Sequence, residues 1–186
     1  MNKYLNYWGL IFTIVILIPN IVFSITCKEG FENRYQNKLV GFLEQIGRFG
    51  CFISMFLIIP FMNKGYWFRQ GKTVYLVLGV ILIILYCLGW IAFWKENSIR
   101  KSLYLSIIPS LLFIESGIIS GNIILLIFVI IFAPCHILIS YKNATLMKFK
   151  DWKVGIRTIF VIILLLNIWI LLKKVNPVYA TEFNEK

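Results

Sequence analysis

Residues 73–94 read TVYLVLGVILIILYCLGWIAFW, a run of 22 residues without a charged side chain. About 20 consecutive apolar residues are enough to carry an α-helix across the hydrocarbon core of a bilayer. A bilayer offers no water to satisfy backbone polar groups, so a segment that crosses it must form its hydrogen bonds internally. This stretch therefore predicts a transmembrane helix.

Five other segments approach the same length and are separated by short polar loops. Their approximate bounds are 4–26, 39–63, 103–119, 121–141 and 154–172. Together they predict an all-α polytopic transmembrane bundle of about six spans over residues 1–174, followed by a short polar tail, residues 175–186. An alternative with five spans, in which residues 103–141 are partly re-entrant, remains open.

The composition supports a membrane protein over a soluble one. Of the 186 residues, 60% are hydrophobic and 15% are charged, whereas a soluble domain has roughly 45–50% apolar and about 25% charged residues. The four cysteines lie far apart and there is a single histidine, although a structural zinc site needs four clustered ligands. We therefore predict neither a metal site nor a cofactor.

The charge is strongly basic, with 19 Lys and Arg against 8 Asp and Glu. The basic residues occupy short loops, which favours the phosphates of membrane lipids as partners and argues against nucleic acid. With six spans both chain ends lie on one side, which holds seven basic residues, while the other side holds eleven. The positive-inside tendency then predicts a plasma-membrane protein with both termini outside the cytoplasm.

Two opposite charges fall inside the second predicted span. Glu44 and Arg48 are four residues apart, so they share one helical face and can pair. The neighbouring Gly47, Gly50 and Ser54 would let another helix approach this face, which we expect to point inward. A charge at a helix centre costs about 2.5–3.5 kcal/mol on the insertion scale. The pair is either part of a ligand site or a self-neutralising structural pair.

The only histidine, His136, follows Pro134 near the end of the fifth predicted span. A proline within a helix leaves a carbonyl free, and an imidazole can bind a ligand or relay a proton as readily as it can join two helices. Counting depth along the spans places five polar residues in the same half of the membrane. This candidate ligand-binding set is Asn20, Glu44, Arg48, Ser106 and His136. Glu115 falls near the opposite end.

Three strings resemble a family of small bacterial multi-pass membrane proteins without an assigned activity: LEQIGRFGC at 43–51, SIIPS at 106–110 and APCHILISYKN at 133–143. The resemblance implies a bacterial plasma-membrane protein and transfers no functional residue. Residues 47–52, GRFGCF, also partly match the G-R-x-G-N-F signature of prolipoprotein diacylglyceryl transferase. Because Cys51 replaces the asparagine and that enzyme's other motifs are missing, we set this match aside.

The sequence contains no H-E-x-x-H, G-x-S-x-G or P-loop motif, which disfavours an enzyme. Our leading hypothesis is a protein that binds or transports a small polar or anionic ligand, or a lipid headgroup, in a pocket around Glu44, Arg48 and His136. The alternative is an interaction or immunity-type protein, without chemistry of its own, that packs against a partner membrane protein.

Overall fold

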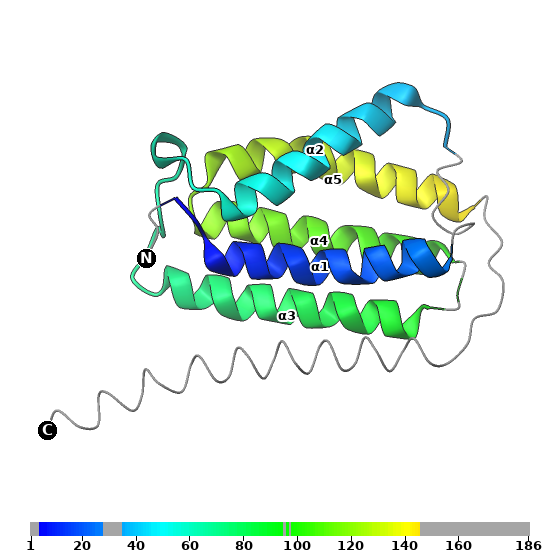
Figure 1. The fold of residues 1–186 in the computed structure, drawn as a ribbon, viewed down its shortest axis with the longest axis horizontal. Coiled ribbons are helices and arrows are strands. Elements are labelled where there is room, and N and C mark those ends of the chain that lie inside the picture. The colour runs from blue at the N-terminus through cyan, green and yellow to red at the C-terminus, as the bar shows by residue number, and fades with distance from the viewer. Residues whose placement is uncertain (1–3, 28–34, 95, 97, 146–186) are drawn as a thin grey trace, which may run out of the picture. The chain divides into compact units, whose positions relative to one another are not determined.

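The structure is a computed structural model that describes residues 4–27, 35–94, 96 and 98–145. These residues form five long helices, all apolar and long enough to cross a membrane, and one short 3₁₀ turn at Pro60–Met62. The helices are α1 (Tyr7–Thr26), α2 (Lys38–Phe56), α3 (Gly71–Ala92), α4 (Ile99–Ile119) and α5 (Ile123–Ala144) (Figure 1). The predicted all-α polytopic bundle is confirmed. The predicted span near 154–172 and the tail 175–186 lie outside the described residues.

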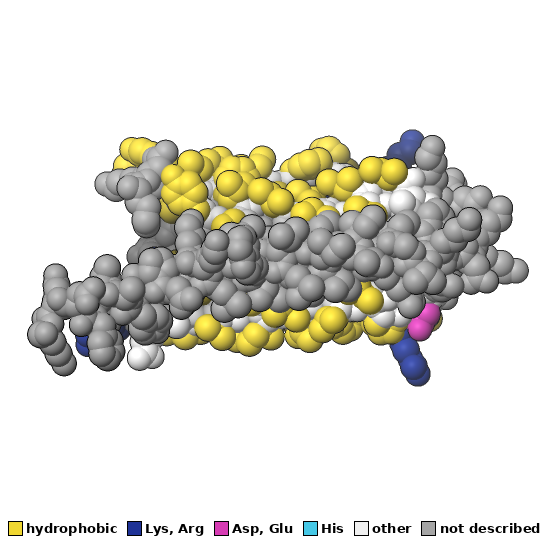
Figure 2. All heavy atoms as spheres, turned by 60° about the horizontal axis from the view of Figure 1, so that its bottom comes forward, with side chains coloured by type: hydrophobic (Ala, Val, Ile, Leu, Met, Phe, Trp, Pro, Cys, Tyr) yellow, Lys and Arg dark blue, Asp and Glu magenta, His cyan; other side chains and the backbone are white. Residues whose placement is uncertain are grey.

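The five helices alternate in direction, so α1, α3 and α5 begin at one end of the bundle and α2 and α4 begin at the other (Figure 1). Helix α2 packs on α5, α4 lies between α5 and α3, and α1 contacts α3 and α2. Large apolar side chains such as Phe42 and Ile130 point outward, at 62% and 72% exposure. Figure 2 shows such side chains along the length of the bundle, with Lys and Arg near its ends. This outer surface suits lipid and not water.

Polar side chains fix where the helices begin. Four of the five described helices start after an Asn or Ser whose side-chain oxygen accepts a backbone N–H of the first turn, as an N-cap does. These residues are Asn6, Asn37, Ser98 and Asn122. Helix α4 consequently begins at Ile99, four residues before the predicted start at 103, and α5 begins at Ile123.

Helix α2 ends at Phe56, seven residues before the end of the predicted span 39–63, so the prediction was wrong at this C-terminal bound. The helix stops at Phe56 because Pro60 cannot continue it and disfavours a helical conformation at the residue before it. The chain instead runs extended, and the Ile58 N–H donates to the Tyr4 carbonyl at 2.9 Å. With 19 residues, α2 is still about 28 Å long.

The end of the bundle where α1 begins is tied together, and we call it the latched end. The Asn6 N–H donates to the Phe56 carbonyl at 2.7 Å, and the Lys64 N–H donates to the Gly121 carbonyl at 3.0 Å. The Asn122 side-chain amide donates to the Ser54 carbonyl at 2.6 Å. We call the other end, where α2 and α4 begin, the open end.

The partly re-entrant alternative for residues 103–141 is wrong. Helices α4 and α5 are both complete, and only Ser120, Gly121 and Asn122 connect them at the latched end. Gly121 has a φ of +63°, a left-handed conformation that glycine adopts without a steric penalty. The turn is therefore shorter than the predicted hairpin at 116–122, because α4 continues through Ile119.

Candidate functional site

A cavity of about 710 Å³ lies among all five described helices and extends toward the open end. Its walls combine apolar and aromatic side chains with nearly as many polar ones. The polar side chains include Asn20 from α1, Glu44 and Arg48 from α2, Tyr86 from α3 and His136 from α5. Four of the five predicted site residues thus line one space, although they are up to 116 positions apart in the sequence.

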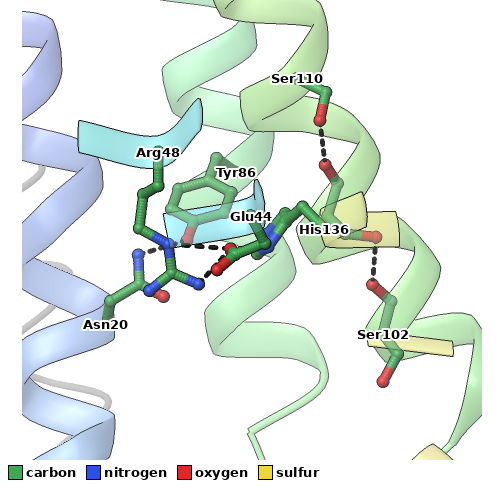
Figure 3. Close-up of polar contacts among 8 residues, drawn as sticks. Asn20, Glu44, Arg48, Tyr86, Ser102, Ser110 and His136 are labelled. Carbon is green, nitrogen blue, oxygen red and sulfur yellow. Dashed lines mark hydrogen bonds and ion pairs between the residues drawn. The ribbon is translucent and has the colours of Figure 1, made fainter. Parts of the chain in front are cut away.

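Glu44 is the centre of the polar cluster, and its side chain is only 3% exposed. Its Oε1 accepts hydrogen bonds from Arg48 Nε at 2.9 Å and from Arg48 Nη2. The Nδ1 of His136 lies 2.9 Å from the same oxygen (Figure 3). The predicted pairing of Glu44 with Arg48 along one helical face is confirmed. His136 adds a contact from another helix.

The contact between His136 and Glu44 depends on how closely α5 approaches α2. A Cβ added to Gly47 would lie 2.8 Å from the backbone of Phe132, so the two helices meet where α2 carries no side chain. Glu44 lies one turn before Gly47, and His136 lies one turn after Phe132. The His136 ring also stacks on the Phe132 ring, with centroids 4.6 Å apart and an interplanar angle of 20°.

An ionised carboxylate oxygen can only accept a hydrogen bond, so the Nδ1 of His136 carries the hydrogen that it shares with Glu44. In the neutral imidazole this leaves Nε2 as an acceptor. The His136 side chain is 21% exposed, which leaves part of the ring available to the cavity. Glu44 therefore sets the orientation of two side chains, Arg48 and His136.

Arg48 extends from α2 toward α1, and Figure 3 shows its guanidinium beside Asn20. Its side chain is 31% exposed. Nε and Nη2 are bound to Glu44, whereas Nη1 forms no hydrogen bond with the residues that the structure describes. The Asn20 amide donates to the Tyr86 hydroxyl at 2.8 Å. The cavity therefore presents one side of a fixed guanidinium.

Ser106 is placed differently from the other predicted site residues. It is 1% exposed, and its hydroxyl donates to the Ser102 carbonyl at 2.7 Å within α4. The residues that line the cavity include Ser102 and Pro109 but not Ser106. Its side chain satisfies the backbone of its own helix, as Ser and Thr often do in membrane helices.

Lys101 was not among the predicted site residues, yet it lines the cavity near the open end. It is 5% exposed, and its ammonium donates to the Trp94 carbonyl at 3.2 Å. The same ammonium lies 4.6 Å from the ring centroid of Phe23 and 5.6 Å from that of Trp90. The sequence offered no signal for this, because the fourth span was expected to begin beyond Lys101 and to leave it in a loop.

Glu115 belongs to a second polar group, at the latched end. Its Oε2 accepts a hydrogen bond from the Ser116 hydroxyl at 3.3 Å, while its Oε1 is buried without a partner among the described residues. Partial burial of the loop residue Tyr66 raises its pKa above the ordinary value, and the nearby Glu115 carboxylate raises that pKa further. This carboxylate takes no part in the cavity around Arg48.

Within the ranges that the structure describes, no group of three or more His, Cys, Asp or Glu side chains is arranged to hold a metal ion. The described cysteines Cys27, Cys51, Cys87 and Cys135 are all free thiols. At the centre of the cavity a guanidinium and an imidazole meet at one carboxylate oxygen, and the Lys101 ammonium lines the cavity nearer the open end. Such groups can bind an anion and exchange a proton.

The fold and the cavity define an all-α multi-pass membrane protein whose helices enclose a polar cluster at mid-bundle. A comparison of the chain with protein-family models, with curated proteins and with solved structures finds no match.

Proposed function

We propose that the cavity binds an anionic ligand, either a small polar anion or the headgroup of a membrane lipid, and that Arg48 is its main contact. The observation that carries this proposal is a partly exposed guanidinium inside a 710 Å³ cavity between apolar helices. Pockets for single small ligands typically have volumes of about 300–1,000 Å³ and a few placed polar groups.

The geometry of Arg48 favours binding over a purely structural role. A guanidinium has five N–H donors in a planar fork, and Glu44 accepts from only one edge of it. The N–H groups of Nη1 remain directed away from that carboxylate. An anionic oxygen is the strongest acceptor for them, because charge-assisted hydrogen bonds are roughly twice as strong as neutral ones.

Glu44 and His136 also make the site rigid before a ligand arrives. Arg48 is held through two nitrogens, and its partner Glu44 is held in turn by His136. Ordering a long, flexible side chain on binding costs about 0.5–1.5 kcal/mol. This cost is already met here by contacts within the protein, so a ligand gains affinity from preorganisation.

The proposal is tested with purified protein by measuring the binding of a soluble anion, sn-glycerol 3-phosphate, and of co-purified anionic lipids by native mass spectrometry. The test variant is Glu44→Gln with Arg48→Gln, which removes both charges together and leaves no buried charge unpaired. We expect affinity to fall by about tenfold or more. The control is Arg100→Gln, an exposed basic residue of α4 that does not line the cavity.

The proposal would be excluded if the anions bound with undiminished affinity to the variant with Glu44→Gln and Arg48→Gln, and also to the variant with Arg48→Ala and His136→Ala. Circular dichroism and size-exclusion chromatography in detergent confirm that each variant is folded. A stoichiometric partner protein that stays bound while no anion binds would favour the alternative of an interaction protein.

We also propose that the protein lies in a bacterial plasma membrane with both termini outside the cytoplasm. The excess of basic residues on the side opposite the termini supports this orientation. Single cysteines placed in the loops 57–70 and 93–98 of a cysteine-free variant test it. An impermeant thiol reagent added to intact cells should label the first loop and not the second, and the reverse pattern would overturn the orientation.

A further inference from the structure

We infer that the occupant of the cavity is a glycerophospholipid from the surrounding bilayer, which enters sideways between α1 and α2 and places its phosphate against Arg48. This inference rests on the proposed function and adds the class of ligand and its route. Three observations support it: the divergence of two helices, the side chains at the resulting opening, and the charge inside.

Helices α1 and α2 touch at the latched end and separate toward the open end (Figure 1). At the contact, a Cβ added to Gly9 would lie 1.9 Å from the Met55 carbonyl oxygen, so the two backbones approach too closely to leave room for a side chain at Gly9. Farther along, both helices contribute walls of the cavity, with Leu17 and Asn20 on α1 and Gln45 on α2. The cavity therefore extends into the space that the divergence creates.

The opening of this space faces the side of the bundle. Gln45 and Phe49 line the cavity, yet both are exposed on the surface of α2, Phe49 at 59%. They lie seven and eleven residues after Lys38, about 10 and 16 Å along the helix. A position so far from the end of a membrane-spanning helix borders acyl chains and not bulk water. A ligand that passes Gln45 and Phe49 therefore comes from the lipid.

The cavity offers both a charged group and apolar surface, as the binding of an amphiphile requires. Arg48 and His136 line the cavity with side chains that are 31% and 21% exposed, and the exposed Phe49 adds an apolar ring at the opening, on the same helix as the polar Gln45. A lipid can place its phosphate on the guanidinium while its acyl chains stay outside, against Phe49 and the apolar surface of the bundle.

The predicted span 154–172, outside the described residues, is the competing occupant of this opening. Its only charged residue is Arg157, and it contains no acidic residue. An apolar helix of this composition supplies no anionic acceptor for Arg48. A phosphate does, and the bilayer supplies phosphates at high local concentration. Charge complementarity therefore favours the lipid.

The test compares two ligands and two neighbouring substitutions, using the full chain in phosphatidylcholine nanodiscs. The ligands are phosphatidic acid with two long acyl chains and sn-glycerol 3-phosphate, which has the same phosphate without the chains. Gln45→Trp places a bulky side chain at the opening. Ile46→Trp is the matched control, because Ile46 is the next residue on α2, is 41% exposed and does not line the cavity.

We expect Gln45→Trp to weaken phosphatidic acid binding by about tenfold or more, with Ile46→Trp close to the wild-type protein. Phe49→Ala, at an exposed position, is a second variant and should weaken the long-chain lipid while leaving glycerol phosphate unchanged. The lateral route is wrong, and the anion site stands, if glycerol phosphate binds through Arg48 but phosphatidic acid does not. The same conclusion follows if Gln45→Trp and Phe49→Ala both leave the binding of phosphatidic acid unchanged. If neither ligand depends on Arg48, the proposed function fails as well.

Discussion

Replacing Gly47 by alanine tests how the packing of α2 on α5 builds the site. The added Cβ would lie 2.8 Å from Phe132 Cα, Cβ and N, whereas ordinary van der Waals contact begins at 3.4 Å. Since part of this obstacle is backbone, no side-chain rotation relieves it and the helices must move apart by roughly half an ångström. Overpacking of this kind typically costs about 1–3 kcal/mol. Alanine regains about 1 kcal/mol through its helix propensity, so we expect a net loss of up to about 2 kcal/mol.

Gly41→Ala is the matched control on the same helix, because a Cβ there meets no atom within 4 Å. We expect it to leave the free energy of unfolding unchanged or to raise it by up to about 1 kcal/mol. The assay is unfolding by sodium dodecyl sulfate titration in detergent micelles, followed by circular dichroism.

The same pair of variants reports on the site, because the chain has a single histidine and its nitrogen-15 NMR signals need no assignment. Separating the helices should lengthen the 2.9 Å contact between His136 Nδ1 and Glu44 Oε1. The Nδ1 signal should therefore shift in Gly47→Ala and not in Gly41→Ala. Equal stability of the two variants together with an unshifted signal would refute the idea that Gly47 sets this spacing.

Three further predictions follow from single contacts. Glu44→Gln leaves Arg48 without its counter-charge and should lower the free energy of unfolding by about 2–4 kcal/mol. Adding Arg48→Met to this variant should restore most of the lost stability. A double variant that is no more stable than Glu44→Gln alone would contradict the ion-pair interpretation. Gly9→Ala should lower the free energy of unfolding by about 3 kcal/mol or more, because its Cβ would overlap a backbone carbonyl oxygen of α2 at 1.9 Å. If this variant were as stable as the wild-type protein, the close crossing of α1 and α2 would be disproved. Tyr66 should ionise at a higher pH than an ordinary tyrosine, since burial and the Glu115 carboxylate raise its pKa, and Glu115→Gln should lower that pKa part of the way. The folded chain then holds the phenolic proton more tightly than the unfolded chain, so this contribution to stability is complete below the ordinary tyrosine pKa and is lost as the pH rises through the folded value. The difference in phenolate absorbance between the wild-type protein and Tyr66→Phe measures it, and an ordinary titration would contradict the assignment.

The pairing of Glu44 with Arg48 could be predicted from spacing alone, because residues four apart on a helix are neighbours whatever the rest of the chain does. The inward direction of their face also followed from the small residues around Gly47, which are buried in the structure. The end of α2 was harder to place, because the apolar run continues to residue 63 while Pro60 stops the helix earlier. The hydropathy of a segment indicates whether it can lie in lipid, but it does not indicate where the helix ends.

The sequence by itself determined that the described chain forms apolar helices of membrane-spanning length, because hydropathy and helix periodicity are local properties. Only the tertiary structure decided which helices meet. His136 reaches Glu44 across 92 positions because α5 lies on the glycine face of α2, and Lys101 enters the wall of the cavity because α4 begins before it. The opening beside Arg48 likewise exists because α1 and α2 cross at Gly9 and then diverge. Such contacts depend on the angles and spacings at which helices pack, which no local pattern encodes.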